Sequence, residues 1–243
     1  MYQNPIIFEV IKNLMIATKD FLFVHVPKTG GMSLTNYFIA NFSGNEIWVS
    51  SKNINHTKWL GGKYNKQKEL KHFQGRRHGD LDYSLQIYES IFDKQPDEVF
   101  TIIRDPVKLL FSFFKHIQKE KVIKRQGLDK NDLPKFIKFA KNYGFKEFVS
   151  KYKFYNMTDD DLLKFYQHTN KIKISTIPLE YLNKYMNLRF PKNKNKLKEI
   201  NSTNYSKRDS ISNEAAEIIY IKYKKYNKLY KKILSEYKSN YGG

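Results

Sequence analysis

An apolar segment that runs directly into a glycine turn is the feature that most restricts how this chain can fold. Residues 21–26 read Phe-Leu-Phe-Val-His-Val and end at a proline, which is typical of a buried parallel strand. Gly30 and Gly31 follow, and residues 33–42 carry apolar side chains at helical spacing. This order predicts a strand, a glycine loop and a helix whose first turn can hold an anion.

The rest of the chain alternates between strand-like and helix-like patterns. Further strands are predicted at residues 99–103 and 172–177. Helices are predicted at residues 83–92, 107–117, 132–155, 158–168, 179–186 and 212–237. The alternation favours an α/β fold with a central, mainly parallel sheet flanked by helices. With 243 residues, 40% of them hydrophobic, we expect one domain over residues 1–243.

The composition excludes several kinds of site. The chain has no cysteine, so disulfides, thiolate metal sites and a cysteine nucleophile are excluded. The histidines show no metal-ligand spacing, and we predict no metal site. No segment reaches the roughly 18 apolar residues that a membrane span requires, and residues 1–20 lack a cleavable signal pattern. We therefore expect a cytoplasmic protein without a transmembrane segment.

The net charge of +20 lies almost entirely in the C-terminal part of the chain. Residues 1–100 hold 12 Lys/Arg and 10 Asp/Glu, so residues 101–243 carry 18 of the 20 net charges. Such a surface favours anionic partners, which could be nucleic acid, a phosphorylated cofactor, an acidic polysaccharide or a membrane surface. A solvated lysine-rich face is the alternative interpretation.

The loop after the first strand has the chemistry of a phosphate or sulfate site. Lys28 supplies a positive charge, and Thr29 and Ser33 supply hydroxyl groups. Gly30 and Gly31 let the backbone approach an anion closely. In the loop of nucleotide triphosphatases the lysine follows the last glycine, whereas here it precedes both, so a kinase or NTPase is disfavoured.

Residues 25–34, His-Val-Pro-Lys-Thr-Gly-Gly-Met-Ser-Leu, closely resemble the H-V-P-K-T-G-G-T-S-L signature of carbohydrate-type sulfotransferases. These enzymes use 3′-phosphoadenosine 5′-phosphosulfate (PAPS), and the resemblance implies a P-loop-like three-layer fold. It also implies that the donor is held by Pro27, Lys28, Thr29, Gly30, Gly31, Met32 and Ser33. Met32 replaces the usual threonine, which removes a hydroxyl but keeps the backbone N–H donors.

A second segment resembles the element with which this family binds the 3′-phosphate of the donor. Arg104-Asp105-Pro106-Val107 follows a predicted strand, and Ser112 lies about two helical turns further along. The resemblance implies that Arg104 and Ser112 contact the 3′-phosphate. Leu109 departs from the pattern, because the family commonly has an arginine there.

A third segment resembles the family's Asn-x-Ser loop near the 3′-phosphate. It spans residues 201–208, and the resemblance adds Ser206, Lys207 and Arg208 to the donor-binding residues. A solvated loop is the alternative interpretation of the basic pair.

The resemblance also implies a catalytic lysine and a catalytic base. Lys28 lies where it can neutralise the leaving phosphate oxygen. The base falls in His78-Gly79-Asp80, where two registers are possible: one makes His78 the base with Asp80 in support, and the other makes Asp80 the base. We favour His78, because imidazole titrates close to neutral pH. We interpret His25 as a packed residue of the strand.

The sequence thus predicts an enzyme that transfers a sulfuryl group from PAPS, without a metal, to an acceptor hydroxyl, on a glycan by resemblance. One alternative is a degenerate protein that binds PAPS without turnover, suggested by Met32, Leu109 and Asp80. Another is a basic nucleic-acid-binding protein, but the chain lacks the motifs of that class and its aromatic residues fall at helical spacing. We therefore expect no specific nucleic-acid partner.

Overall fold

The computed structural model describes residues 15–42, 46–50, 71–73, 80–125, 133–167, 172–193, 195, 197 and 211–241. The chain divides into two compact units that are each discontinuous in sequence. The sheet unit contains Ile11–Ile103 and Lys164–Asn201. The helical unit contains Met1–Val10, Arg104–Leu163 and Ser202–Gly243. The prediction of one domain over residues 1–243 stays a prediction.

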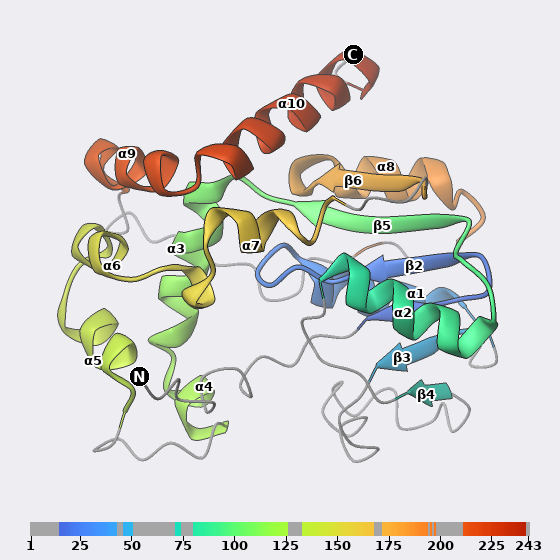
Figure 1. The fold of residues 1–243 in the computed structure, drawn as a ribbon, viewed down its shortest axis with the longest axis horizontal. Coiled ribbons are helices and arrows are strands. Elements are labelled where there is room, and N and C mark those ends of the chain that lie inside the picture. The colour runs from blue at the N-terminus through green and yellow to red at the C-terminus, as the bar shows by residue number, and fades with distance from the viewer. Residues whose placement is uncertain are drawn as a thin grey trace. The chain divides into compact units, whose positions relative to one another are not determined.

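The sheet unit is built on a six-stranded sheet with the order β4-β3-β1-β2-β5-β6 (Figure 1). The strands are β1 (Ile16–Ala17), β2 (Phe21–Val24), β3 (Trp48–Ser50), β4 (Lys71–Phe73), β5 (Glu98–Ile103) and β6 (Ile174–Pro178). Among the described strands, the pairs β2–β5, β5–β6 and β3–β4 are parallel, and the two pairs formed by β1 are antiparallel. The α/β prediction with a mainly parallel sheet is therefore confirmed.

Strands β2 and β5 form the centre of the sheet, and every residue in both is buried. Successive side chains of a strand point to opposite faces, so complete burial means that both faces are covered. One face is covered by aromatic packing: Phe38 of α1 (Gly31–Asn41) lies 5.0 Å from Phe21 and 6.0 Å from Phe190, between ring centroids. The sheet unit also contains α2 (Leu81–Phe92), η4 (Leu179–Tyr181) and α8 (Leu182–Arg189).

The helical unit has its own apolar core. Its elements are α3 (Pro106–Ile117), α4 (Glu120–Arg125), α5 (Lys135–Asn142), α6 (Phe145–Lys151), η3 (Phe154–Asn156), α7 (Asp159–Leu163), α9 (Asn213–Lys222) and α10 (Lys224–Tyr241). Phe111 and Phe114 of α3 pack on Phe145 and Phe148 of α6, with ring centroids 4.9 Å and 5.2 Å apart. Four aromatic residues of the segment 132–155 are buried, as their helical spacing predicts: Phe145, Phe148, Phe154 and Tyr155. Tyr143 is instead exposed.

Two predicted helices are divided in the structure. The segment 132–155 breaks at Gly144, which stands between α5 and α6, because glycine in a helix interior loses more conformational entropy than other residues. The closing helix predicted at residues 212–237 breaks at Tyr223, whose buried hydroxyl accepts a hydrogen bond from the Phe154 N–H at 2.9 Å. Strands β1, β3 and β4 and helix α4 were not predicted, since their short segments show no distinct periodicity.

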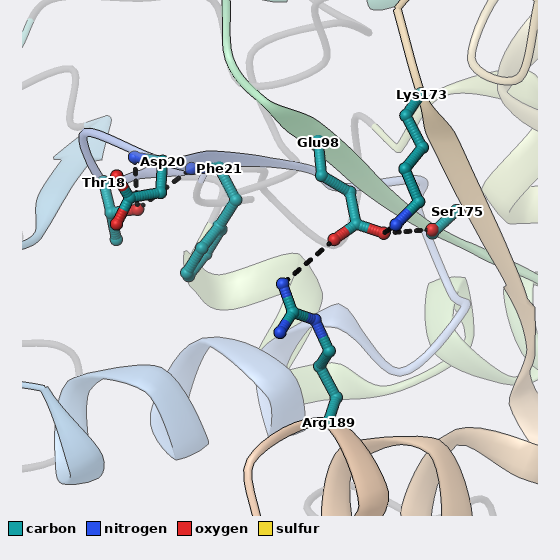
Figure 2. A network of polar contacts seen from close by, with 7 residues as sticks. All are labelled: Thr18, Asp20, Phe21, Glu98, Lys173, Ser175 and Arg189. Carbon is teal, nitrogen blue, oxygen red and sulfur yellow. Dashed lines mark hydrogen bonds and ion pairs between the residues drawn. The ribbon is translucent and has the colours of Figure 1, made fainter.

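A buried carboxylate at the amino end of β5 forms ion pairs and a hydrogen bond with residues beside and within β6 and at the end of α8 (Figure 2). The side chain of Glu98 is 6% exposed and pairs with Lys173 at 3.1 Å and with Arg189 at 3.4 Å. Ser175 donates a short hydrogen bond to the same carboxylate. Burial alone would raise the pKa of Glu98, but the Ser175 bond and the two cations outweigh it and lower the pKa below its ordinary value.

We predict that Glu98→Gln lowers the free energy of unfolding by about 1 kcal/mol at pH 7, since charge-assisted bonds are lost but both cations are half-exposed or more. Because the folded-state pKa is lowered, this stabilisation is present above the ordinary glutamate pKa of about 4.3 and is lost as the pH falls through the folded-state value. Urea unfolding of the unmodified protein and of Glu98→Gln, at pH 7 and at pH 3, measures the difference in their free energies of unfolding. A difference that stayed the same at both pH values would contradict this account of Glu98.

Candidate active site

The loop after β2 contains two residues in the left-handed region of backbone conformation. Lys28 has φ 64° and Gly30 has φ 89°. Glycine adopts this conformation without strain, whereas most side chains do not. A Cβ atom on Gly30 would also lie 2.8 Å from Cδ1 of Leu179, at the start of η4. Gly30 is therefore required both for its conformation and for this close packing.

Gly31, the first residue of α1, is required for a different reason. A Cβ atom there would lie 2.1 Å from both Cδ2 and Nε2 of His25. The His25 ring is buried and stacks on Phe23 with ring centroids 5.8 Å apart. His25 is thus a packed residue, as the sequence predicts, and its ring sets how closely the first turn of α1 approaches the end of β2.

The amino end of α1 has no side-chain cap. Gly30 is the capping residue and the first turn contains no acidic side chain. The Gly30 carbonyl accepts hydrogen bonds from the N–H groups of Ser33 at 3.0 Å and Leu34 at 3.3 Å. The N–H groups at the start of a helix have no acceptor within it, and the helix dipole adds positive potential there. The helix start thus suits an anionic ligand.

The polar side chains of the loop divide into two kinds. Thr29 is fully buried, and its hydroxyl donates to the Val26 carbonyl at 2.8 Å. That hydrogen bond holds the loop closed, so the Thr29 hydroxyl hydrogen is used within the protein. Lys28 is partly exposed, while Ser33 is buried in the first turn.

Arg104 directly follows β5 and precedes α3 in the helical unit. Asp105 caps α3 by accepting a hydrogen bond from the Lys108 N–H at 2.9 Å, and Pro106 occupies the first turn. Ser112 is buried on α3. Leu109 of α3 is fully buried, at the place where the resemblance would have an arginine.

Asp80 caps α2. Its Oδ1 accepts a hydrogen bond from the Tyr83 N–H at 3.0 Å, and its carbonyl accepts one from the Ser84 hydroxyl at 2.8 Å. This structural role accounts for an aspartate at this position without any part in catalysis. His78, Ser206, Lys207 and Arg208 lie outside the described residues, so their assignments stay predictions.

The strand register relates the two motif segments to the sheet. Val24 pairs with Thr101 in a parallel ladder, so β2 and β5 end at the same edge. Ligand sites of α/β proteins form outside the carboxyl ends of such strands. The loop 27–30 follows β2 after two residues, and Arg104 is the next residue after β5.

In the part of the chain that the structure describes, no group of three or more His, Asp or Glu side chains is arranged to hold a metal ion. No helix in the same residues is long and apolar enough to cross a membrane.

A comparison with protein-family models places much of the chain in a known family. The model described as the sulfotransferase family matches residues 12–177, which is more than half of the chain. The match includes the glycine loop, Asp80, Arg104 and Ser112, and it ends before α9 and α10. A search of curated proteins finds no match for this chain.

We predict that Gly31→Ala lowers the free energy of unfolding by about 1–3 kcal/mol, because the new methyl group overlaps the His25 ring. His25→Ala removes that ring. The double variant should therefore lose less free energy of unfolding than the two single variants lose together, and the difference should be about 0.5–3 kcal/mol. Urea unfolding of the four proteins gives this coupling energy.

Gly30→Ala is the matched control for that experiment. Its strain comes from the positive φ and from Leu179, so His25→Ala should not relieve it. If the effects of His25→Ala and Gly31→Ala on the free energy of unfolding were additive, as they should be for His25→Ala and Gly30→Ala, the His25 ring would not restrict residue 31.

Proposed function

The chain belongs to the sulfotransferase family, and from that premise we propose that it transfers a sulfuryl group from PAPS to a hydroxyl group of a saccharide. The observation that carries the proposal is the start of α1, where a glycine loop bearing Lys28 precedes a helix with no side-chain cap and no acidic residue in its first turn. Such a helix start stabilises a bound phosphosulfate.

The proposed roles follow the reaction. The acceptor oxygen attacks the sulfur atom, the bond between sulfur and the 5′-phosphate oxygen breaks, and the acceptor proton passes to a base. The products are a sulfate ester and 3′-phosphoadenosine 5′-phosphate (PAP). Lys28 and the first amides of α1 stabilise the negative charge that develops on the leaving phosphate. His78 is the proposed base, and no metal takes part.

Arg104 is the proposed ligand of the 3′-phosphate, which distinguishes the donor from other adenine nucleotides. A guanidinium group binds phosphate with two parallel hydrogen bonds. Ser112, Ser206, Lys207 and Arg208 are proposed to contribute to the same recognition. Because a buried leucine occupies position 109, the chain makes this recognition without the second arginine that the resemblance would supply.

The basic charge of residues 101–243 supports an anionic glycan as acceptor. Incubation with labelled PAPS and a panel of neutral and acidic glycans, followed by mass spectrometry of the product, tests the reaction and the acceptor together. Transfer to acidic glycans is the expected result. Binding of PAP without transfer to any acceptor would instead support the degenerate alternative.

We predict that PAP raises the melting temperature and that ATP raises it less, because a ligand that binds only the folded state stabilises it. Arg104→Ala should weaken PAP binding by roughly 10- to 100-fold, the effect of losing a charge-assisted contact. Titration calorimetry measures both proteins.

Lys135→Ala is the control for charge alone, since it removes an exposed cation from α5 of the helical unit. It should leave PAP affinity unchanged. If PAP and ATP bound equally well to the unmodified protein, the donor assignment would be wrong.

We predict that His78→Ala lowers kcat by roughly 10²- to 10⁴-fold and leaves PAP affinity nearly unchanged, since a general base acts on the acceptor proton. Lys28→Ala should reduce both, because its charge faces the donor before and during bond cleavage. Steady-state kinetics and calorimetry separate the two effects.

Asp80→Asn distinguishes the two registers. Asparagine is also a good N-cap, so the cap on α2 is kept while the carboxylate is lost. Near-normal kcat in Asp80→Asn is expected. A severe loss of kcat there, with near-normal activity in His78→Ala, would make Asp80 the base.

A further inference from the structure

The main chain of Arg104 is held by a tyrosine from α10, 122 residues further along the chain. The Tyr226 hydroxyl accepts a hydrogen bond from the Arg104 N–H at 3.3 Å and donates one to the Arg104 carbonyl at 2.9 Å. Tyr226 is fully buried. One hydroxyl therefore satisfies both main-chain groups of a residue that lies outside any helix or strand.

Tyr226 is itself fixed in place through the start of α10. The Asp159 carboxylate, at the start of α7, accepts hydrogen bonds from the N–H groups of Lys225 at 2.7 Å and Tyr226 at 2.9 Å. Lys225 also pairs with Asp160 at 2.7 Å. Figure 1 shows α7 beside the first turns of α10. The carboxylate satisfies helix N–H groups that would otherwise lack partners, which holds the hydroxyl of Tyr226 at a defined position.

On the other side of Arg104, Asp105 caps α3. The main chain at Arg104 is thus fixed by Tyr226 at the residue itself and by the helix cap immediately after it. A guanidinium group binds phosphate with two bonds in a narrow range of geometries, so its affinity depends on where the main chain places it. A displacement of about 1 Å is enough to weaken such a contact substantially.

We propose that Tyr226 is a positioning residue for Arg104 and that it thereby sets the preference of this chain for a 3′-phosphorylated nucleotide. This inference rests on the proposed function, in which Arg104 binds the 3′-phosphate. The inference adds that recognition of the 3′-phosphate depends on α10, which lies beyond the residues matched by the family model.

Tyr223 provides a matched control. It is also fully buried, and its hydroxyl accepts a hydrogen bond from the Phe154 N–H at 2.9 Å and donates one to the Met157 carbonyl at 3.3 Å. Burial raises the pKa of Tyr223 to about 12, so the hydroxyl stays protonated at neutral pH. Tyr223 therefore makes the same two kinds of hydrogen bond as Tyr226. Its partners, Phe154 and Met157, lie in a segment that carries no proposed donor-binding residue.

The experiment compares Tyr226→Phe, Tyr223→Phe and Arg104→Ala by titration calorimetry with PAP and with adenosine 5′-phosphate, which lacks the 3′-phosphate. Each tyrosine variant loses two hydrogen bonds and keeps the aromatic ring, so both should lower the melting temperature. Tyr226→Phe should weaken PAP binding by roughly 5- to 30-fold and change adenosine 5′-phosphate binding less than about twofold. Tyr223→Phe should leave both affinities unchanged.

A double variant tests whether Tyr226 acts through Arg104. Adding Tyr226→Phe to Arg104→Ala should weaken PAP binding no further, because the group that is positioned is already absent. If Tyr226→Phe does not fold, Asp159→Asn takes its place. Asp159 accepts the two N–H bonds with its two oxygens, whereas an asparagine amide has one acceptor oxygen, so one of these bonds is lost and the Tyr226 hydroxyl stays intact. A smaller loss of the preference for PAP is then expected.

The outcomes separate this inference from the proposed function. Failure of the unmodified protein to bind PAP would overturn the proposed function and this inference with it. Loss of PAP binding in Arg104→Ala but not in Tyr226→Phe or Asp159→Asn would overturn the inference alone. Equal weakening in Tyr226→Phe and Tyr223→Phe, or further weakening in the double variant, would show that Tyr226 has only a structural role.

Discussion

Burial of β2 and β5 on both faces is the constraint on which the rest of the sheet unit depends. It favours apolar side chains along both strands, with Glu98 and Thr101 as the polar exceptions in β5. The parallel pairing puts both carboxyl ends at one edge of the sheet. The glycine loop begins at that edge, whereas the ion pairs of Glu98 lie at the amino end of β5. The stabilising charges and the glycine loop therefore lie at opposite ends of the parallel pair formed by β2 and β5.

The sequence predicts the parts of the fold that buried strands and helix periodicity encode. β2 and β5 were found because strands buried on both faces appear as continuous apolar runs. β6 was also predicted, although its first three residues are only partly buried. β1 and β3 are too short for such a pattern, and hydrogen bonds to neighbouring strands define them. The division of the closing helix into α9 and α10 could not be predicted, because it accompanies the contact between the Tyr223 hydroxyl and the distant residue Phe154.

The candidate site is predictable in its local motifs and not in its distant contacts. The glycine loop can be identified because the chemistry of anion binding requires a characteristic series of residues. The role of Asp80 as a helix cap was available in the sequence but was missed, because the helix was predicted to begin at Tyr83. The contact between Leu179 and Gly30 joins residues far apart in the chain, and only the structure shows it.

The hydrogen bonds between Tyr226 and Arg104 also have a consequence for synthesis of the protein. At about 5–20 residues per second, a ribosome adds Tyr226 roughly 6 to 24 seconds after Arg104. During that interval β5 and α3 can leave the ribosome and begin to pack while the main chain between them still bonds to water. The segment at Arg104 therefore acquires its final arrangement late in biogenesis, after the strand and the helix on either side of it have been translated.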